Sequence, residues 1–124
     1  ARAAARLLAL PEPPTAIFAV TDMAAVGALG HARKVGLRVP QDLAIVGYND
    51  IPLASRLIPG LTTVRVPIQE FGSGAARMLL EQIDGSQVLP RRVVFTPQLV
   101  VRGSTAGGVD EAETVHASGR AGSE

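Results

Sequence analysis

Residues 16–50 read AIFAVTDMAAVGALGHARKVGLRVPQDLAIVGYND, and this stretch decides the fold. It begins and ends on short apolar runs, Ala16–Val20 and Leu43–Tyr48, whose lengths suit strands. Between them, Met23–Val35 reads as a helix, with Asp22 in the N-cap position and Gly36 just beyond its last turn. Strand, helix and strand joined by short connections form a βαβ unit, whose strands run parallel. The sequence therefore predicts an α/β fold on a parallel sheet, with the first strand buried on both faces.

The segments on either side extend this pattern. Upstream, Ala1–Leu10 has the composition of a helix, which the following prolines end. Downstream we expect a short helix, a strand, a longer helix with an apolar stripe, and two strand segments around a proline. In that order they are Ile51–Leu57, Leu61–Val66, Pro67–Ile83, Arg92–Phe95 and Gln98–Arg102. Residues 106–124 are mostly Gly, Ser, Ala and acidic residues without apolar periodicity, so we expect a disordered tail there.

Composition limits the possible functions. The chain has 124 residues, of which 47% are hydrophobic and 3% aromatic, so small and aliphatic side chains must build its core. The absence of cysteine excludes disulfides, thiolate nucleophiles and Cys-based zinc sites, and it fits a cytoplasmic protein. Residues 1–105 carry 11 basic and 7 acidic groups, which is far from the basic stripe of a DNA-binding surface. No apolar run approaches the roughly 20 residues that span a membrane.

Polar pairs follow both predicted strands of the βαβ unit. Thr21 and Asp22 come after the first strand, and Asn49 and Asp50 come after the second. The carboxyl ends of neighbouring parallel strands meet at one edge, where open α/β sheets bind ligands. Hydroxyl, amide and carboxylate groups there can hydrogen-bond a polyol or a purine. The alternative is that Asp22 only caps its helix and that Asn49 and Asp50 only shape a turn.

Motifs for catalysis are not found. The glycines make neither a G-x-G-x-x-G fingerprint nor a Walker A loop, and no nucleophile, base and orienting group occur together. His31 and His116 lie far apart in the sequence, so we expect no metal site. We therefore predict a binding protein without a cofactor, not an enzyme.

Six segments resemble the effector-binding core of LacI/GalR-type transcription repressors. Each motif is modest alone, but their order and spacing together are specific, and they cover nearly all of the chain except the tail. The segments are Pro14–Ala19, Asp22–Ala24, Gly36–Asp42, Val46–Ala54, Pro59–Val64 and Leu99–Thr105.

The resemblance implies a periplasmic-binding-protein-like core of two α/β subdomains that close around a sugar or nucleobase. In the family, the residue after the Gly-Tyr pair contacts the effector, and here it is Asn49 where aspartate is frequent. Thr21 occupies another pocket position where asparagine or serine is frequent, and Val66 and Ile68 match pocket positions of some relatives. Because Asn in place of Asp removes a charge and adds a donor, the effector cannot be copied from a relative.

The resemblance also implies a homodimer. Its contacts in the family come from the helix after the first strand and from the segment after the second. The matching residues are Val26, Leu29, Gly30, Leu53 and Leu57. They are small or apolar, which suits an interface, and the equally weighted alternative is that they belong to an ordinary core.

By the same resemblance, this chain is an incomplete core with pieces of two subdomains. Residues 1–60 and 89–105 correspond to the C-terminal subdomain, and residues 61–88 cross to the N-terminal one. The helix-turn-helix DNA-binding domain and the first half or more of the core are expected outside this chain. Operator DNA would then bind only through that missing domain. The alternative is a solute-binding protein of a sugar uptake system, which shares the fold but binds no DNA.

The isolated chain is predicted to be marginally stable or to aggregate, because an incomplete sheet exposes strand edges and apolar faces. Light scattering and a thermal melt of the purified chain measure this. A soluble monomer that melts cooperatively well above room temperature would contradict the prediction.

Overall fold

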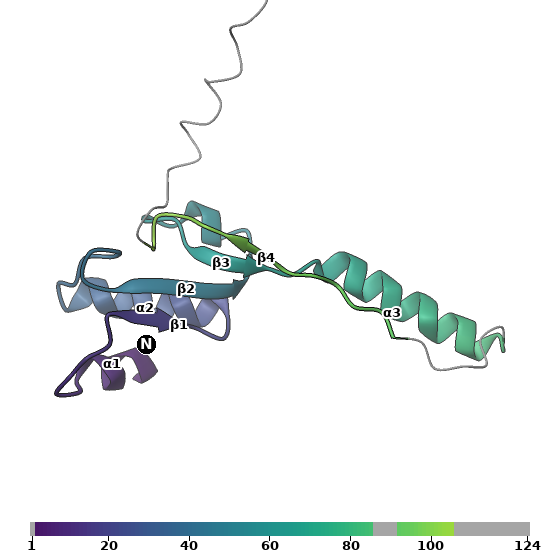
Figure 1. Ribbon diagram of the computed structural model, residues 1–124, viewed down its shortest axis with the longest axis horizontal. Coiled ribbons are helices and arrows are strands. Elements are labelled where there is room, and N and C mark those ends of the chain that lie inside the picture. The colour runs from purple at the N-terminus through teal and green to yellow at the C-terminus, as the bar shows by residue number, and fades with distance from the viewer. Residues whose placement is uncertain (1, 86–91, 106–124) are drawn as a thin grey trace, which may run out of the picture.

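The computed structural model describes residues 2–85 and 92–105, and Figure 1 shows a sheet-containing body from which one long helix projects. The helices are α1 (Arg2–Leu8), α2 (Asp22–Lys34), the single 3-10 turn η1 (Ala54–Arg56) and α3 (Ile68–Ile83). The strands are β1 (Ala16–Phe18), β2 (Ala44–Asn49), β3 (Thr62–Arg65) and β4 (Gln98–Val100). The predicted tail, residues 106–124, lies outside the described residues.

The sheet has the order β1-β2-β3-β4. The first three strands are parallel, which confirms the predicted βαβ unit of β1, α2 and β2. The last strand pairs with β3 in the antiparallel direction, so the sheet is mixed at this edge. The direction reverses because the chain leaves the sheet after β3, forms α3, and runs back beside β3 (Figure 1).

The core lies between α2 and the sheet and is built from small side chains. Helix α2 packs on β2, and α1 packs on α2. Alanine every three or four residues gives α2 a smooth buried face, which lets its backbone approach the sheet closely. The buried hydrophobic residues are Ala4, Ala19, Ala25, Ala28, Ala32, Leu43, Ile45, Ala54 and Leu61.

Three predicted elements differ in the structure. Burial of β1 on both faces is wrong, because Phe18 is 63% exposed and only the opposite face, with Ile17, packs on the core. Arg92–Phe95 is not a strand, and it has no strand to pair with among the described residues. It lies beside α3, where the rings of Phe95 and Phe71 meet edge-to-face with their centroids 5.9 Å apart. The helix predicted over Ile51–Leu57 is reduced to the single turn η1.

The segment after β4 joins the strands at the opposite end of the sheet from α3. Ser104 is fully buried, and its Oγ donates to the Ile45 carbonyl at 2.5 Å and accepts from the Thr62 amide at 2.8 Å. The Ile45 amide in turn donates to the Ser104 carbonyl at 2.9 Å. Ser104 thereby links Ile45 of β2 to Thr62 of β3.

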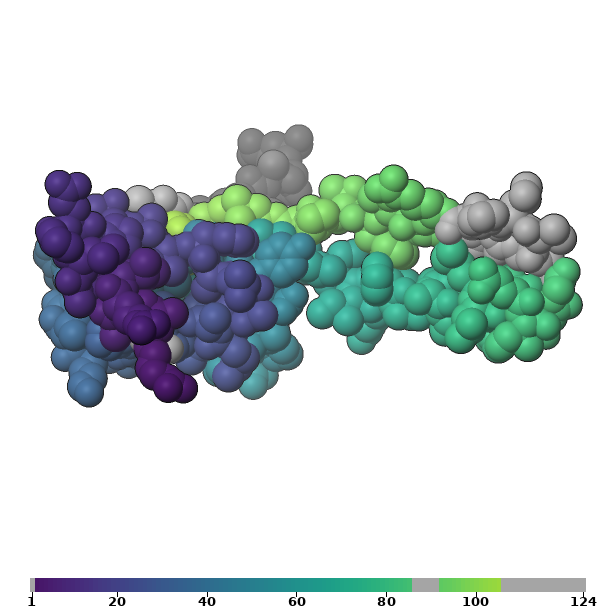
Figure 2. Space-filling model, turned by 90° about the horizontal axis from the view of Figure 1, so that it is seen from below, coloured from purple at the N-terminus to yellow at the C-terminus, as the bar shows by residue number. Residues whose placement is uncertain are grey.

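Helix α3 confirms the predicted span but buries no residue. Most of its apolar stripe is exposed, although Phe71 contacts Phe95, and Figure 2 shows that a narrow waist joins α3 to the body. The exposed apolar residues of α3 are Ile68, Phe71, Leu79, Leu80 and Ile83. A helix with a bare apolar stripe needs a partner surface to be stable in water. In the described part of the chain, no helix is long and apolar enough to span a membrane.

Gly47→Ala is expected to destabilise the protein by about 1–3 kcal/mol, because the new Cβ overpacks a closed site. It would collide with the Asp22 carboxylate and lie 2.9 Å from Leu61 Cδ2. Urea unfolding of the whole protein measures the change. The matched control is Gly72→Ala in α3, where a Cβ has nothing within 4 Å, and which should stabilise the helix by about 0.5–1 kcal/mol. Equal effects of the two variants would contradict the assignment.

Candidate functional site

A pocket of about 540 Å³ lies at the carboxyl ends of β2 and β3, beside the waist that leads to α3 (Figure 2). It is the edge at which open α/β sheets bind ligands. Its lining combines amides, a guanidinium and carboxylates with apolar side chains. The lining residues are Asn49, Asp50, Ile51, Pro52, Arg65, Val66, Pro67, Ile68, Gln69, Glu70, Thr96 and Gln98.

The turn after β2 places two of the predicted site residues. Asn49 and Asp50 have positive φ values of 114° and 58°, a region that Asn and Asp enter more readily than most residues with a Cβ. The chain reverses there and returns through Ile51, whose amide is held by Asp22. Asn49 and Asp50 therefore shape the turn after β2 and also lie at the pocket.

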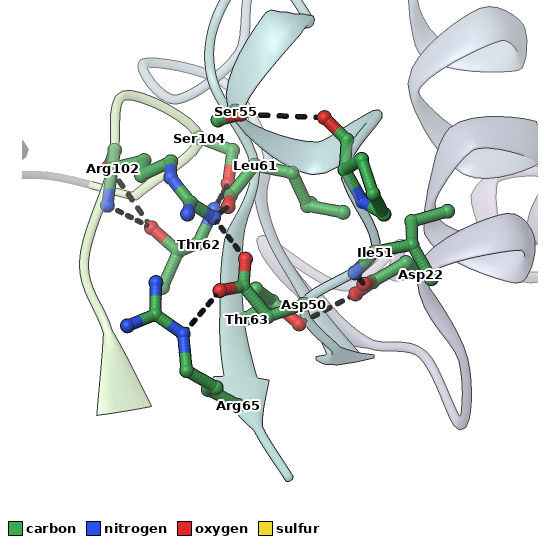
Figure 3. A network of polar contacts seen from close by, with 11 residues as sticks. Asp22, Asp50, Ile51, Ser55, Leu61, Thr62, Thr63, Arg65, Arg102 and Ser104 are labelled. Carbon is green, nitrogen blue, oxygen red and sulfur yellow. Dashed lines mark hydrogen bonds and ion pairs between the residues drawn. The ribbon is translucent and has the colours of Figure 1, made fainter. Parts of the chain in front are cut away.

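Asp50 is the centre of an ion-pair group at the pocket edge (Figure 3). Its Oδ2 accepts from Arg65 Nε at 2.6 Å, and its Oδ1 lies 2.8 Å from Arg102 Nη1. The Asp50 and Arg102 side chains are only 7% and 10% exposed, whereas that of Arg65 is 53% exposed. Arg102 Nη1 also donates to the Leu61 carbonyl at 2.8 Å. Asp50 is thus fixed between a buried cation and a half-exposed one.

The protonation of Asp50 reflects two opposing effects. Burial raises the pKa of Asp50, but the hydrogen bonds and charges of Arg102 and Arg65 outweigh burial and hold that pKa below its ordinary value. The carboxylate is therefore charged at neutral pH, and both of its oxygens are already paired.

Asp22 has a structural position rather than a place in the pocket lining. It is fully buried, and its carboxylate accepts from the Ile51 amide at 2.8 Å and from Thr63 Oγ1 at 2.5 Å. The prediction that it caps α2 is wrong: Thr21 is the N-cap, and its side chain accepts from the Ala24 amide at 3.2 Å. Asp22 instead turns inward because Gly47, which has no side chain, leaves space for its carboxylate.

The structure brings together four of the six residues predicted to bind ligand. Asn49, Asp50, Val66 and Ile68 all line the pocket. Thr21 and Asp22 belong to the same edge, through the contact of Asp22 with Ile51, but they do not line the pocket. Whether these residues contact a ligand remains a prediction.

Sequence reasoning missed the residues that β3 and β4 contribute. Arg65 and Gln98 line the pocket, and Arg102 fixes Asp50 behind it. A detectable signal was present in Arg102, because it ends the apolar run Leu99–Val101, where a buried charge needs a partner. Which acid pairs with it depends on strand order, which the sequence does not show.

The residues predicted to form a dimer interface lie on α2 and around η1. Gly30 is exposed, with open space around it, and Leu53 is 41% exposed. Leu29 and Leu57 pack partly against the core, and Val26 is half-buried. Leu29 and Leu57 thus fit the core alternative in part, and the dimer contact stays a prediction.

Comparison with known proteins identifies the family. A family model described as "Periplasmic binding protein-like domain" matches residues 1–105. The chain belongs to this family. Among curated proteins, the HTH-type transcriptional regulator MalR of Streptomyces coelicolor is 47% identical over 97 residues, which are 78% of this chain and 28% of that protein. The resemblance to LacI/GalR-type regulators is thereby confirmed, and the alternative of a solute-binding protein is not favoured.

Solved structures of transcriptional regulators show the same fold. A complex of the transcriptional regulator CelR with cellobiose is 39% identical, with a TM-score of 0.71, and covers 73% of this chain and 28% of that one. A LacI family regulator from Enterococcus faecium with bound ribose is 30% identical, with a TM-score of 0.76. The match covers 85% of this chain and 38% of that one. This periplasmic-binding-protein-like chain therefore spans 28–38% of the length of these relatives.

Asp50→Asn is expected to lower the free energy of unfolding by on the order of 3 kcal/mol at neutral pH, because it leaves Arg102 buried without its counter-ion. Since the folded-state pKa of Asp50 lies below the ordinary 3.8, its contribution is complete above that pH and is lost as pH falls through the folded pKa. The difference from wild type should therefore be constant near neutrality and shrink below about pH 4.

Urea unfolding of both proteins between pH 7 and pH 3 tests this. Asp42→Asn is the control, because Asp42 also pairs with an arginine, Arg38, but in an exposed position where the loss should be much smaller. A difference between wild type and Asp50→Asn that does not change with pH would rule out the charge as the cause.

Proposed function

We propose that this chain is part of the effector-binding core of a LacI-type transcriptional repressor, and that a sugar or nucleobase binds in the pocket at the ends of β2 and β3. The observation that carries the proposal is the pocket itself, with polar and apolar side chains at the carboxyl edge of a parallel sheet. The cellobiose and ribose complexes of LacI-type relatives support a small polyol as the effector.

The pocket binds without doing chemistry. The Asn49 amide has both donors and an acceptor, so it can hydrogen-bond a hydroxyl group in either direction. Val66 and Ile68 supply apolar contact to the face of a ring. Asp50, whose two oxygens are already paired, keeps the turn in place and has little capacity left for a ligand. These residues orient a ligand; none of them activates it.

In this proposal the pocket is one wall of a cleft. Residues 1–60 and 89–105 belong to one subdomain, and residues 61–88 cross to a second subdomain, whose remaining elements are supplied by residues outside this chain. The narrow waist and the exposed apolar residues of α3 support this division, because α3 buries none of its residues against the described part of the body.

Effector binding closes the cleft and changes the separation of DNA-binding heads in a homodimer. Val26, Leu29, Gly30, Leu53 and Leu57 contribute to the dimer contact in this proposal. A helix-turn-helix domain outside this chain binds operator DNA in the cytoplasm, as the designation of MalR as an HTH-type regulator suggests. Such allostery requires that the effector bind the closed and open states with different affinity.

Asn49→Gly in the full-length protein is expected to weaken effector binding at least about 10-fold and abolish the response, while operator binding stays intact. Glycine is the informative replacement, because it removes the amide but accepts the φ of 114° that strains alanine. A thermal-shift screen of pentoses, hexoses and purines identifies the effector, since a ligand of the native state raises the melting temperature.

Gln41→Ala is the control, because it removes an exposed amide that does not line the pocket. DNA binding with and without the identified effector is then compared for the three proteins. Unchanged induction in Asn49→Gly would remove Asn49 from the site, and no binding by wild type of any sugar or purine would contradict the proposed function.

A further inference from the structure

Three polar side chains form a row across the sheet at the pocket. The strand register pairs Asn49 of β2 with Arg65 of β3, and it pairs Arg65 with Gln98 of β4. All three line the pocket. Neighbouring strands lie about 4.8 Å apart, so the row presents an amide, a guanidinium and a second amide across roughly 10 Å. We call these three residues the polar row.

The side chain of Arg65, at the centre of the row, is fixed through its Nε, while its Nη groups are available to a ligand. Its Nε is bound to Asp50 Oδ2 at 2.6 Å, and Asp50 is in turn fixed by the buried Arg102 (Figure 3). The Nη groups of Arg65 have no acceptor among the described residues, although the side chain is half-exposed at the pocket. A guanidinium fixed through Nε loses little conformational freedom when its Nη groups bind a ligand.

The charges around the row favour an uncharged ligand. Asp50 and Glu70 are the acidic lining residues, and they are balanced by Arg65 in the lining and by Arg102 behind it. Among the described residues no net charge is left over to pair with an ionic group of a ligand. The Nη groups donate only, whereas the two amides both donate and accept. Ligand atoms opposite Arg65 must therefore be acceptors, and in an uncharged polar ligand they are hydroxyl, ether or carbonyl oxygens.

We propose that Arg65 contacts the effector directly, donating from its Nη groups to oxygen atoms of a neutral polyhydroxylated ligand, with Asn49 and Gln98 on either side. This inference rests on the proposed function and adds to it a contact residue and a ligand class. Asp50 acts as a positioning residue, because it orients the guanidinium without reaching the ligand.

The test measures ligand affinity of the full-length protein by calorimetry. Wild type, Arg65→Gln and Arg65→Lys are each titrated with ribose, cellobiose, glucose 6-phosphate and glucuronate. We expect wild type to bind a neutral sugar, and both variants to bind it about 10- to 100-fold more weakly, because lysine keeps the charge but loses the planar pair of Nη donors.

Arg38→Gln is the matched control. It also removes an arginine from an ion pair with an aspartate, with Arg38 Nη2 2.7 Å from Asp42 Oδ1, but that pair does not line the pocket at β2 and β3. Its affinity for the neutral sugar should equal that of wild type. Melting of all variants without ligand shows whether Arg65 substitution acts only through stability.

A deoxy analogue of the bound sugar separates contact from structure. Wild type should bind the analogue that lacks the hydroxyl facing Arg65 more weakly than the sugar itself. Arg65→Gln should bind the two with equal affinity, because without the guanidinium that hydroxyl has no donor to lose. A purely structural arginine would weaken binding of the sugar and all its analogues equally.

The outcomes are distinct. Wild-type affinity in Arg65→Gln overturns the contact, while a lost response in Asn49→Gly would keep the proposed function. Binding of the phosphate or the carboxylate sugar alone, or of no neutral sugar, overturns the ligand class. Equal weakening for every deoxy analogue assigns Arg65 a structural role and also overturns the inference.

Discussion

The buried carboxylate of Asp22 joins three parts of the chain that are distant in sequence. It starts from the first turn of α2, accepts from the Ile51 amide in the turn after β2, and accepts from the Thr63 hydroxyl on β3. A buried carboxyl group is tolerated only when its oxygens are hydrogen-bonded, so Asp22 needs both of these contacts. Gly47 makes the arrangement possible, because any side chain there would occupy the place of the carboxylate. The relative position of helix, turn and central strand follows from this one residue.

The geometry of the pocket depends on these contacts of Asp22. Once Asp22 holds Ile51, the turn that carries Asn49 and Asp50 is fixed at both ends, and its positive φ values are maintained by the surrounding structure. A second carboxylate, Asp50, then ties this turn to β3 through Arg65 and to the segment after β4 through Arg102. The two aspartates have different roles. Asp22 fixes the turn at the edge of the sheet, and Asp50 orients the guanidinium of Arg65, which lines the pocket. A site of this kind is suited to recognition, because its polar groups are preorganised before a ligand arrives.

The exposed apolar surfaces have a different physical meaning. Phe18 of β1 and the stripe of α3 are hydrophobic where a self-sufficient domain would be polar. The chain matches less than a third of the length of MalR, and in the proposed two-subdomain core the remaining elements would cover such surfaces. In the proposed two-subdomain core, stability and ligand binding would be properties of the larger assembly, with the waist as the connection between the two subdomains.

Much of the local structure was determined by the sequence alone. Apolar runs of strand length, the alanine-rich α2 ended before Gly36, and the amphipathic stripe over Ile68–Ile83 are local patterns, and the corresponding elements formed where they were predicted. The position of Asn49 and Asp50 at the edge of the sheet that carries the pocket also followed, since parallel strands align their carboxyl ends. The tertiary structure decided the rest. That Asp22 is buried and not the cap, that β4 runs antiparallel, and that Arg65 and Gln98 stand beside Asn49 all depend on strand neighbours far apart in the chain. Hydrogen-bond and charge partners at such separations are chosen by packing in three dimensions, which local periodicity does not encode.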